Sequence, residues 1–254
     1  MIGKVLYGMA VAVLAGCVSQ QAKMEAIDAK TDAQSRARAH TELGVAYFES
    51  QQYGVAREEL NIAVSADPNH APAYNYLGLV HMAINENSAA EKAFRRALKI
   101  DPEDSATNNN YGMFLCLKKG DKAGLKHFMT ALKNPLYATP QIAYANAGIC
   151  ARNLGDEAKA EEWLRKALSV QPDQPQALYH LADLSFRHGE LGNARGLITR
   201  HLRVTVPAAE ALWLAARIEH QMGDRNALAS YGILLNNRYP GAPQTRAFNE
   251  GRFQ

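Results

Sequence analysis

Residues 71–104, APAYNYLGLVHMAINENSAAEKAFRRALKIDPED, form a unit that recurs along this chain of 254 residues. A small residue in this stretch, Gly78, has counterparts in both directions, and successive members of the series are 34, 34, 36, 34 and 34 residues apart. The series consists of Gly44, Gly78, Gly112, Gly148, Ala182 and Ala216. Such a regular spacing predicts an array of stacked repeats rather than a single compact domain.

Four further residue types recur in the same phase: an Ala, a large apolar residue, a second Ala and a closing Pro. They are Ala56, Ala90, Ala160 and Ala194; Leu60, Phe94, Phe128, Leu164 and Ile198; Ala63, Ala97, Ala131 and Ala167; and Pro68, Pro102, Pro172 and Pro240. The small residues predict close helix crossings. The large apolar residue is expected to fill the space between helices of neighbouring repeats. Pro ends a helix because it lacks an amide hydrogen and restricts the preceding residue.

This pattern resembles the tetratricopeptide repeat, a helix–turn–helix unit of about 34 residues. It predicts an all-α fold, a right-handed superhelix of about six such repeats followed by a C-terminal tail. The third repeat is irregular, with Gly124 in place of Ala and two inserted residues, which indicates a loosened junction between two halves. The predicted boundaries are 37–70, 71–104, 105–140, 141–174, 175–208 and 209–242 for the repeats, and 243–254 for the tail.

The amino terminus carries a different signal. Lys4 precedes an apolar stretch that is too short to span a bilayer, which needs about 20 apolar residues, and the stretch ends in Leu-Ala-Gly-Cys at Cys17. This resembles the bacterial lipobox, in which the chain is cut before the Cys and the Cys is acylated. The resemblance implies a signal peptide over residues 1–16, acyl chains such as palmitate on Cys17, and a tether over 17–36. Val18, where Asp would favour inner-membrane retention, implies the outer membrane, facing the periplasm.

Composition and motifs argue against catalysis. The formal net charge is +3 with no long run of like charges, so nothing points to a nucleic-acid partner. The sequence contains no nucleotide-binding, hydrolase or metalloprotease motif, and its 8 His are dispersed. We therefore predict a protein that is not an enzyme, with no catalytic residue, cofactor, metal or small-molecule substrate, and whose work is to bind another protein.

Cys116 and Cys150 lie in the first helices of neighbouring repeats, in a chain expected to enter an oxidising compartment. Neighbouring first helices pack side by side, so the two thiols can approach each other. Two interpretations stay open: a disulfide, which requires Cα atoms closer than about 7 Å, or two reduced thiols that pack as small apolar groups.

Repeat arrays of this kind bind peptides on the face lined by first helices. In each repeat the inward positions are roughly the fifth, ninth and twelfth. The predicted protein-binding groove consists of Thr41, Val45, Phe48, Asn75, Leu79, Met82, Asn109 and Met113. Its lining is mostly apolar, which suits an apolar helix face or an extended peptide, and Asn75 and Asn109 are expected to bond a ligand's backbone. Equivalent positions in the second half carry charge at Arg152, Asp183 and Arg217.

The lipobox and six repeats together resemble the type IV pilus biogenesis lipoproteins of the PilF/PilW kind, and the segments at residues 40–47 and 106–112 are similar to that family. The resemblance implies a pilotin, which binds the secretin subunit of the pilus machinery and promotes its outer-membrane localisation and multimerisation. The alternative is an outer-membrane scaffold that docks cell-wall hydrolases or envelope assembly factors. Neighbouring pilus genes would favour the pilotin.

Overall fold

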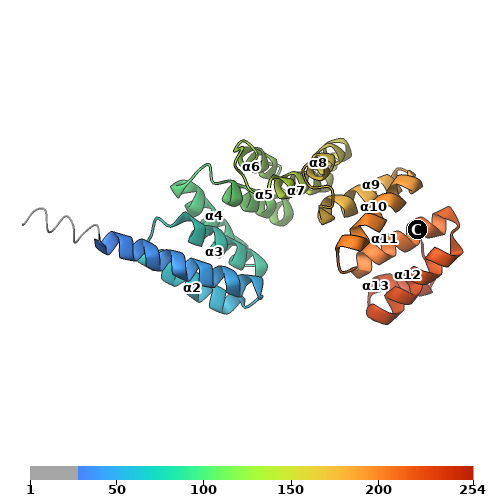
Figure 1. The fold of residues 1–254 in the computed structure, drawn as a ribbon, viewed down its shortest axis with the longest axis horizontal. Coiled ribbons are helices and arrows are strands. Elements are labelled where there is room, and N and C mark those ends of the chain that lie inside the picture. Colours follow the sequence, from blue (N-terminus) through green and yellow to red (C-terminus); the bar gives the residue numbers. More distant parts are fainter. Residues whose placement is uncertain (1–27, 254) are drawn as a thin grey trace, which may run out of the picture. The chain divides into compact units, whose positions relative to one another are not determined.

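The computed structural model of the chain describes residues 28–253, which contain helices and turns but no strand. Contacts divide the chain into two compact units, residues 1–110 and 111–254. In each unit the helices follow one another in pairs joined by short turns, as Figure 1 shows. This arrangement confirms the predicted all-α repeat fold.

The first unit contains the helices of the first two repeats and the start of the third. The segment 28–36 was expected to belong to the tether, but it is helical and continues without a break into the first repeat, so that this helix covers residues 28–49. The other helices are α2 (Tyr53–Ala66), α3 (Ala71–Ala83), α4 (Asn87–Ile100) and the beginning of α5 (Ser105–Lys119).

Glycines at the middle of the first helices allow the paired helices of one repeat to approach each other. A Cβ atom added to Gly78 would lie 2.5 Å from the Phe94 ring, and one added to Gly44 would lie 2.6 Å from Leu60 Cγ. Phe94 and Leu60 are fully buried. The recurring large residue therefore packs against the glycine of its own repeat, and it also packs against the next repeat, as Leu60 does with Leu77.

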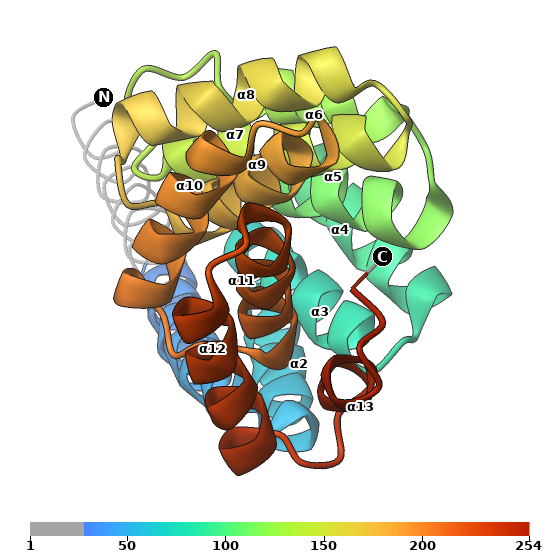
Figure 2. The same cartoon turned by 90° about the vertical axis from the view of Figure 1, so that its right-hand side faces the viewer.

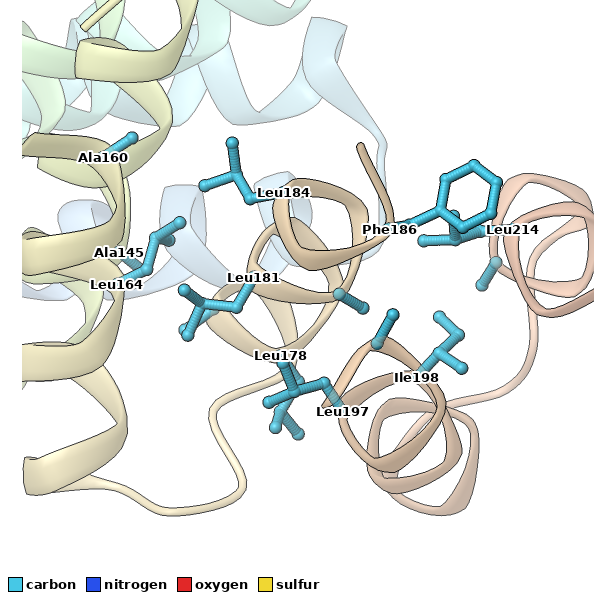
Figure 3. Close-up of a cluster of buried hydrophobic side chains, with 14 of the residues drawn as sticks. Ala145, Ala160, Leu164, Leu178, Leu181, Leu184, Phe186, Leu197, Ile198 and Leu214 are labelled. Atoms are coloured by element: carbon cyan, nitrogen blue, oxygen red, sulfur yellow. The ribbon is translucent and has the colours of Figure 1, made fainter. Parts of the chain in front are cut away.

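The second unit continues the same architecture around its own core. Leu178, Leu181 and Leu184 of one first helix pack with Leu164 and Ile198 of two second helices, as Figure 3 shows. After the end of α5, its helices are α6 (Ala123–Ala131), α7 (Pro140–Asn153), α8 (Glu157–Val170), α9 (Pro175–Arg187), α10 (Leu191–Val204), α11 (Ala209–Met222), α12 (Arg225–Arg238) and α13 (Pro243–Asn249).

The irregular third repeat has a tighter helix crossing than the others. A Cβ atom on Gly124 would lie 2.5 Å from the Gly112 backbone oxygen, so Gly124 is required where other repeats carry Ala. Its second helix, α6, has only 9 residues. A disulfide joins Cys116 to Cys150 of the next repeat, with Cα atoms 5.6 Å apart. Of the two interpretations of these cysteines, the structure has the bonded one.

The segment treated as a C-terminal tail contains helix α13, which packs against α11 and α12 (Figure 2). The sixth repeat has Gly232 at the position where the earlier repeats have a large apolar residue. A Cβ atom on Gly232 would lie 2.2 Å from the ring of Phe248, which belongs to α13. Phe248 therefore fills the place left by the missing side chain, and α13 caps the last repeat.

The turns between paired helices use one residue with a left-handed backbone. Later repeats place glycine there, as at Gly155 (φ 83°), whereas the first two use Gln51 (φ 62°) and Asn85 (φ 61°). A left-handed backbone costs an ordinary side chain about 1–2 kcal/mol. We expect Gln51→Gly to raise the free energy of unfolding by roughly 0.5–1 kcal/mol, as measured by chemical denaturation. The same change at Gln52, which has φ −85°, is the control and should not stabilise.

Candidate protein-binding surface

The ninth residue of each repeat lies at the surface of its first helix. Val45 and Leu79 in the first unit are half-buried, and so are the four equivalent residues of the second unit: Met113, Ile149, Asp183 and Arg217. Residues at equivalent positions of successive repeats occupy the same place on their helices, so these side chains mark one face of each unit. Three of the predicted groove residues, Val45, Leu79 and Met113, thus have surface that a partner can reach.

The fifth position behaves differently from the predicted groove lining. Thr41, Asn75 and Asn109 are only 6%, 4% and 5% exposed. The Thr41 hydroxyl donates to the Ala37 carbonyl at 2.7 Å. Asn110 donates to Asn75 Oδ1 at 3.1 Å and accepts from Asn109 at 3.2 Å. These polar side chains are therefore almost fully buried and bond other protein atoms, with Asn75 accepting through its side-chain oxygen.

The twelfth position in the first unit is aromatic or flexible and half-buried. The Phe48 ring lies 5.7 Å from the Tyr53 ring and 6.3 Å from the Tyr76 ring, measured between centroids. Burial, followed by the charge of Glu49, raises the pKa of the Tyr76 hydroxyl. Phe48 is thus partly a core residue, and Met82 is half-buried. We call Val45, Phe48, Leu79 and Met82 the early-repeat patch.

In the second unit, Met113 and Ile149 border a small cavity beside the disulfide. The cavity has a volume of about 70 Å³ and is lined mainly by apolar side chains. Its walls are Met113, Cys116, Leu117, Phe128, Asn146, Ile149, Cys150 and Gln176. The disulfide itself is 5% exposed at Cys116 and 1% at Cys150, so it shapes the cavity wall without being open to large reagents.

Charged side chains on the later first helices are largely paired with each other. Arg152 forms a salt bridge with Asp183 and lies 3.0 Å from the Nδ1 atom of His180. Burial, followed by the charges of Arg152 and His201, lowers the pKa of His180 to about 4. His180 is therefore neutral near pH 7, and the charge predicted for this face is mostly compensated internally.

The described residues were also expected to lack other kinds of site. Between residues 28 and 253, no group of three or more His, Cys, Asp or Glu side chains is placed to hold a metal ion. In the same range, no helix has the length and apolar character needed to cross a membrane. The predicted lipidation site, Cys17, lies outside the described residues.

Comparison with known proteins places this geometry in a family. Tetratricopeptide-repeat family profiles match residues 26–105 and 142–174. The crystal structure of PilW, a widely conserved type IV pilus biogenesis factor, superposes on this chain with a TM-score of 0.75 and is 31% identical to it in sequence. The matched region is 83% of this chain and 97% of the PilW chain. The chain belongs to the PilW family of type IV pilus biogenesis proteins.

A second member of this family, PilF of Pseudomonas aeruginosa, is similar in both structure and sequence. Its solved structure has a TM-score of 0.78 at 27% identity and covers 87% of this chain and 99% of its own. The curated sequence, a type IV pilus assembly protein, is 27% identical over 210 residues, which is 83% of each chain. The likeness to both proteins therefore extends over most of the repeat array.

Two residues of this PilW-family chain were not expected at its surfaces from sequence. Asn110 forms hydrogen bonds with Asn75 and Asn109, the two predicted groove amides. It belongs to the run Asn108-Asn109-Asn110, but the sequence does not indicate which of these three side chains bonds to Asn75. Phe253 lies against Trp213 and His220 of α11. No repeat position signals that contact, because it depends on where α13 directs the chain.

Proposed function

We propose that this chain acts in type IV pilus assembly as an outer-membrane pilotin, which binds secretin subunits and promotes their localisation and multimerisation in the outer membrane. The observation that carries the proposal is the likeness to PilW and PilF, which extends over at least 83% of this chain and 97% of each solved structure. Membership of this family supports a part in building the pilus, and the pilotin role is the specific form that we infer.

The early-repeat patch supports binding to an apolar segment of the partner. Its four side chains, Val45, Phe48, Leu79 and Met82, are half-buried and come from the first helices of two successive repeats. An apolar surface of this kind suits an amphipathic helix or an extended peptide with apolar side chains, and Met adapts to irregular shapes. The charged face of the second unit offers a partner fewer unpaired charges to bind, since Arg152 and Asp183 already neutralise each other.

The lipid anchor at Cys17 supplies the localisation part of the proposal. Each methylene group buried in a bilayer contributes about 0.8 kcal/mol, and stable attachment needs more than one chain. A triply or doubly acylated Cys17 would therefore hold the repeats at the membrane, where a bound secretin subunit is kept close to the bilayer that it must enter.

We expect Cys17→Ala to leave the repeats folded and to abolish secretin multimers in the outer membrane, because position 17 precedes the repeats in the sequence. Circular dichroism checks folding, and membrane fractionation followed by detection of heat-stable secretin multimers checks localisation. A Cys17→Ser variant serves as a second, nearly isosteric replacement that also removes the thiol. If the Cys17→Ala protein and the multimers both fractionate normally with the outer membrane, the anchor has no such role.

The partner itself is tested by a pull-down with the lipidated protein from envelope extracts, with identification of the eluted proteins. Recovery of the secretin supports the pilotin. Recovery of cell-wall hydrolases or envelope assembly factors without secretin would replace it with the scaffold alternative.

A further inference from the structure

The last first helix, α11, presents three side chains at the positions expected to contact a partner. Trp213, Arg217 and His220 are the fifth, ninth and twelfth residues of the sixth repeat. Trp213 and Arg217 are half-buried and His220 is exposed, whereas the residues between them, such as Leu214 and Ile218, are buried in the core. We call Trp213, Arg217 and His220 the α11 face.

The chain's own C-terminal segment lies on the α11 face. The Phe253 ring stacks on Trp213 with centroids 5.4 Å apart and on His220 with centroids 4.2 Å apart. The Phe253 carbonyl oxygen accepts a long hydrogen bond, 3.5 Å, from Arg217 Nε. One aromatic side chain and one backbone oxygen therefore engage all three residues of the face, as a bound peptide would.

A specific turn directs this segment. Helix α13 ends at Asn249, and Gly251 just beyond it has φ 68°. The amide of Arg252 donates to the Ala247 carbonyl at 2.9 Å, and the amide of Gly251 donates to the Phe248 carbonyl at 3.0 Å. This pair of bonds is the Schellman motif, which reverses the chain at a helix end. The turn places Phe253 at the α11 face without burying it, since Phe253 stays half-exposed.

Next to the segment lie an open hollow and an arginine, which could accommodate a second peptide. An open hollow of about 540 Å³ borders the segment and is lined by Trp213, Ala247, Gly251 and Arg252. Among the described residues Arg217 forms no salt bridge, and its guanidinium group lies over the Phe186 ring at 4.6 Å. Glu250, the carboxylate side chain of the described part of the segment, is paired with Arg252 at 2.5 Å. The face thus combines aromatic surfaces with an arginine that forms no salt bridge within residues 28–253.

We propose that the α11 face is a second peptide-binding surface, which takes a partner segment carrying a phenylalanine-like aromatic side chain and a nearby carbonyl or carboxylate oxygen for Arg217. Residues 250–253 are its built-in competitor. They cover the face in the free protein, and a partner segment of this chemistry displaces them. The surface differs from the early-repeat patch in its residues and in the side chains that it accepts.

The competition has a measurable consequence. A ligand that binds only the uncovered face has its apparent affinity reduced by the fraction of molecules in which the face is uncovered. A tethered competitor acts at an effective concentration on the order of millimolar. Removing Phe253 is therefore expected to strengthen binding of a free peptide by at least roughly ten-fold.

The test uses a fluorescently labelled peptide with the sequence of residues 249–254, Asn-Glu-Gly-Arg-Phe-Gln, titrated with the protein to millimolar concentration. A chain that lacks residues 252–254 should bind it saturably, and the intact chain should bind at least about ten-fold more weakly. The same peptide with Ala in place of Phe should not bind. If the shortened chain does not give a normal circular dichroism melt, Phe253→Ala in the intact chain replaces it.

Matched variants on one helix locate the site. In the shortened chain, His220→Ala should weaken the peptide several-fold. Met222→Ala, on the same helix and 38% exposed, should leave the affinity unchanged. Equal affinity for the shortened and intact chains, or no binding to the shortened chain, would overturn the proposal. No secretin enters this experiment, so either failure leaves the proposed pilotin function untouched.

Discussion

A chain carrying Leu79→Asp is expected to fold normally and to lose secretin binding. Leu79 is half-buried on α3 in the early-repeat patch, so part of the new carboxylate stays in water in the free protein. In the complex the same carboxylate would be pressed against an apolar segment. Leaving a charge desolvated and unpaired costs several kcal/mol. A loss of about 3 kcal/mol, or more than a hundred-fold in Kd, is expected in titrations with the purified secretin segment.

The choice of Leu79 over Phe48 follows from their contacts. Phe48 lies against the rings of Tyr53 and Tyr76, so replacing it with Asp would also lower the stability of the first unit and confuse the result. Ile62→Asp is the matched control, because Ile62 is 46% exposed on a second helix of the same unit. It adds the same charge away from the patch and should leave both folding and binding unchanged.

The opposite outcome is equally informative. If Leu79→Asp melts normally and still binds secretin with unchanged affinity, the partner does not lie on the early-repeat patch. A charge reversal at Arg217 then becomes the decisive variant, because the second unit is the remaining candidate. If binding is confined to the first unit, Arg217→Glu should matter much less than Leu79→Asp.

The repeat fold could be predicted from the sequence because its determinants are local and repeated. Gly78 and Phe94 are 16 residues apart, and each repeat supplies a similar pair. Helix α13 could not be predicted in the same way. Its position depends on Phe248 entering the space above Gly232, a contact between a degenerate repeat and a segment with no counterpart elsewhere. The only sequence signal of this contact was Gly232 itself, which occupies a position where the other repeats have a large apolar residue.

The candidate surface was predicted less completely than the fold. The fifth and ninth residues of a repeat differ by four positions, which corresponds to about 40° of rotation around a helix. That difference separates Asn75, which is 4% exposed and bonded to Asn110, from Leu79, which is half-buried at the surface. Hydrophobic periodicity cannot resolve so small an angle, because it depends on how closely the next repeat packs.

The disulfide between Cys116 and Cys150 is expected to stabilise the second unit by roughly 3–4 kcal/mol. The two residues are 34 apart in sequence, and the chain-entropy model assigns a closed loop of this length about 4 kcal/mol. The bond crosses the irregular third repeat, where α6 has only 9 residues and fewer side chains are available for packing. A covalent link between the third and fourth repeats therefore supports the junction at which the helix pair is shortest.

The double variant Cys116→Ala/Cys150→Ala should lower the thermal midpoint by roughly 10 °C, at about 2–4 °C for each kcal/mol in a unit of this size. Reductant should lower the midpoint of the native protein toward the same value and should not affect the variant. Both sulfurs are buried, and Ala keeps the site apolar, so the comparison isolates the covalent bond. Thiol labelling of unreduced, denatured protein gives the independent check, since two reactive thiols beyond any at Cys17 would show that the bond does not form and that the cysteines only pack as small apolar groups.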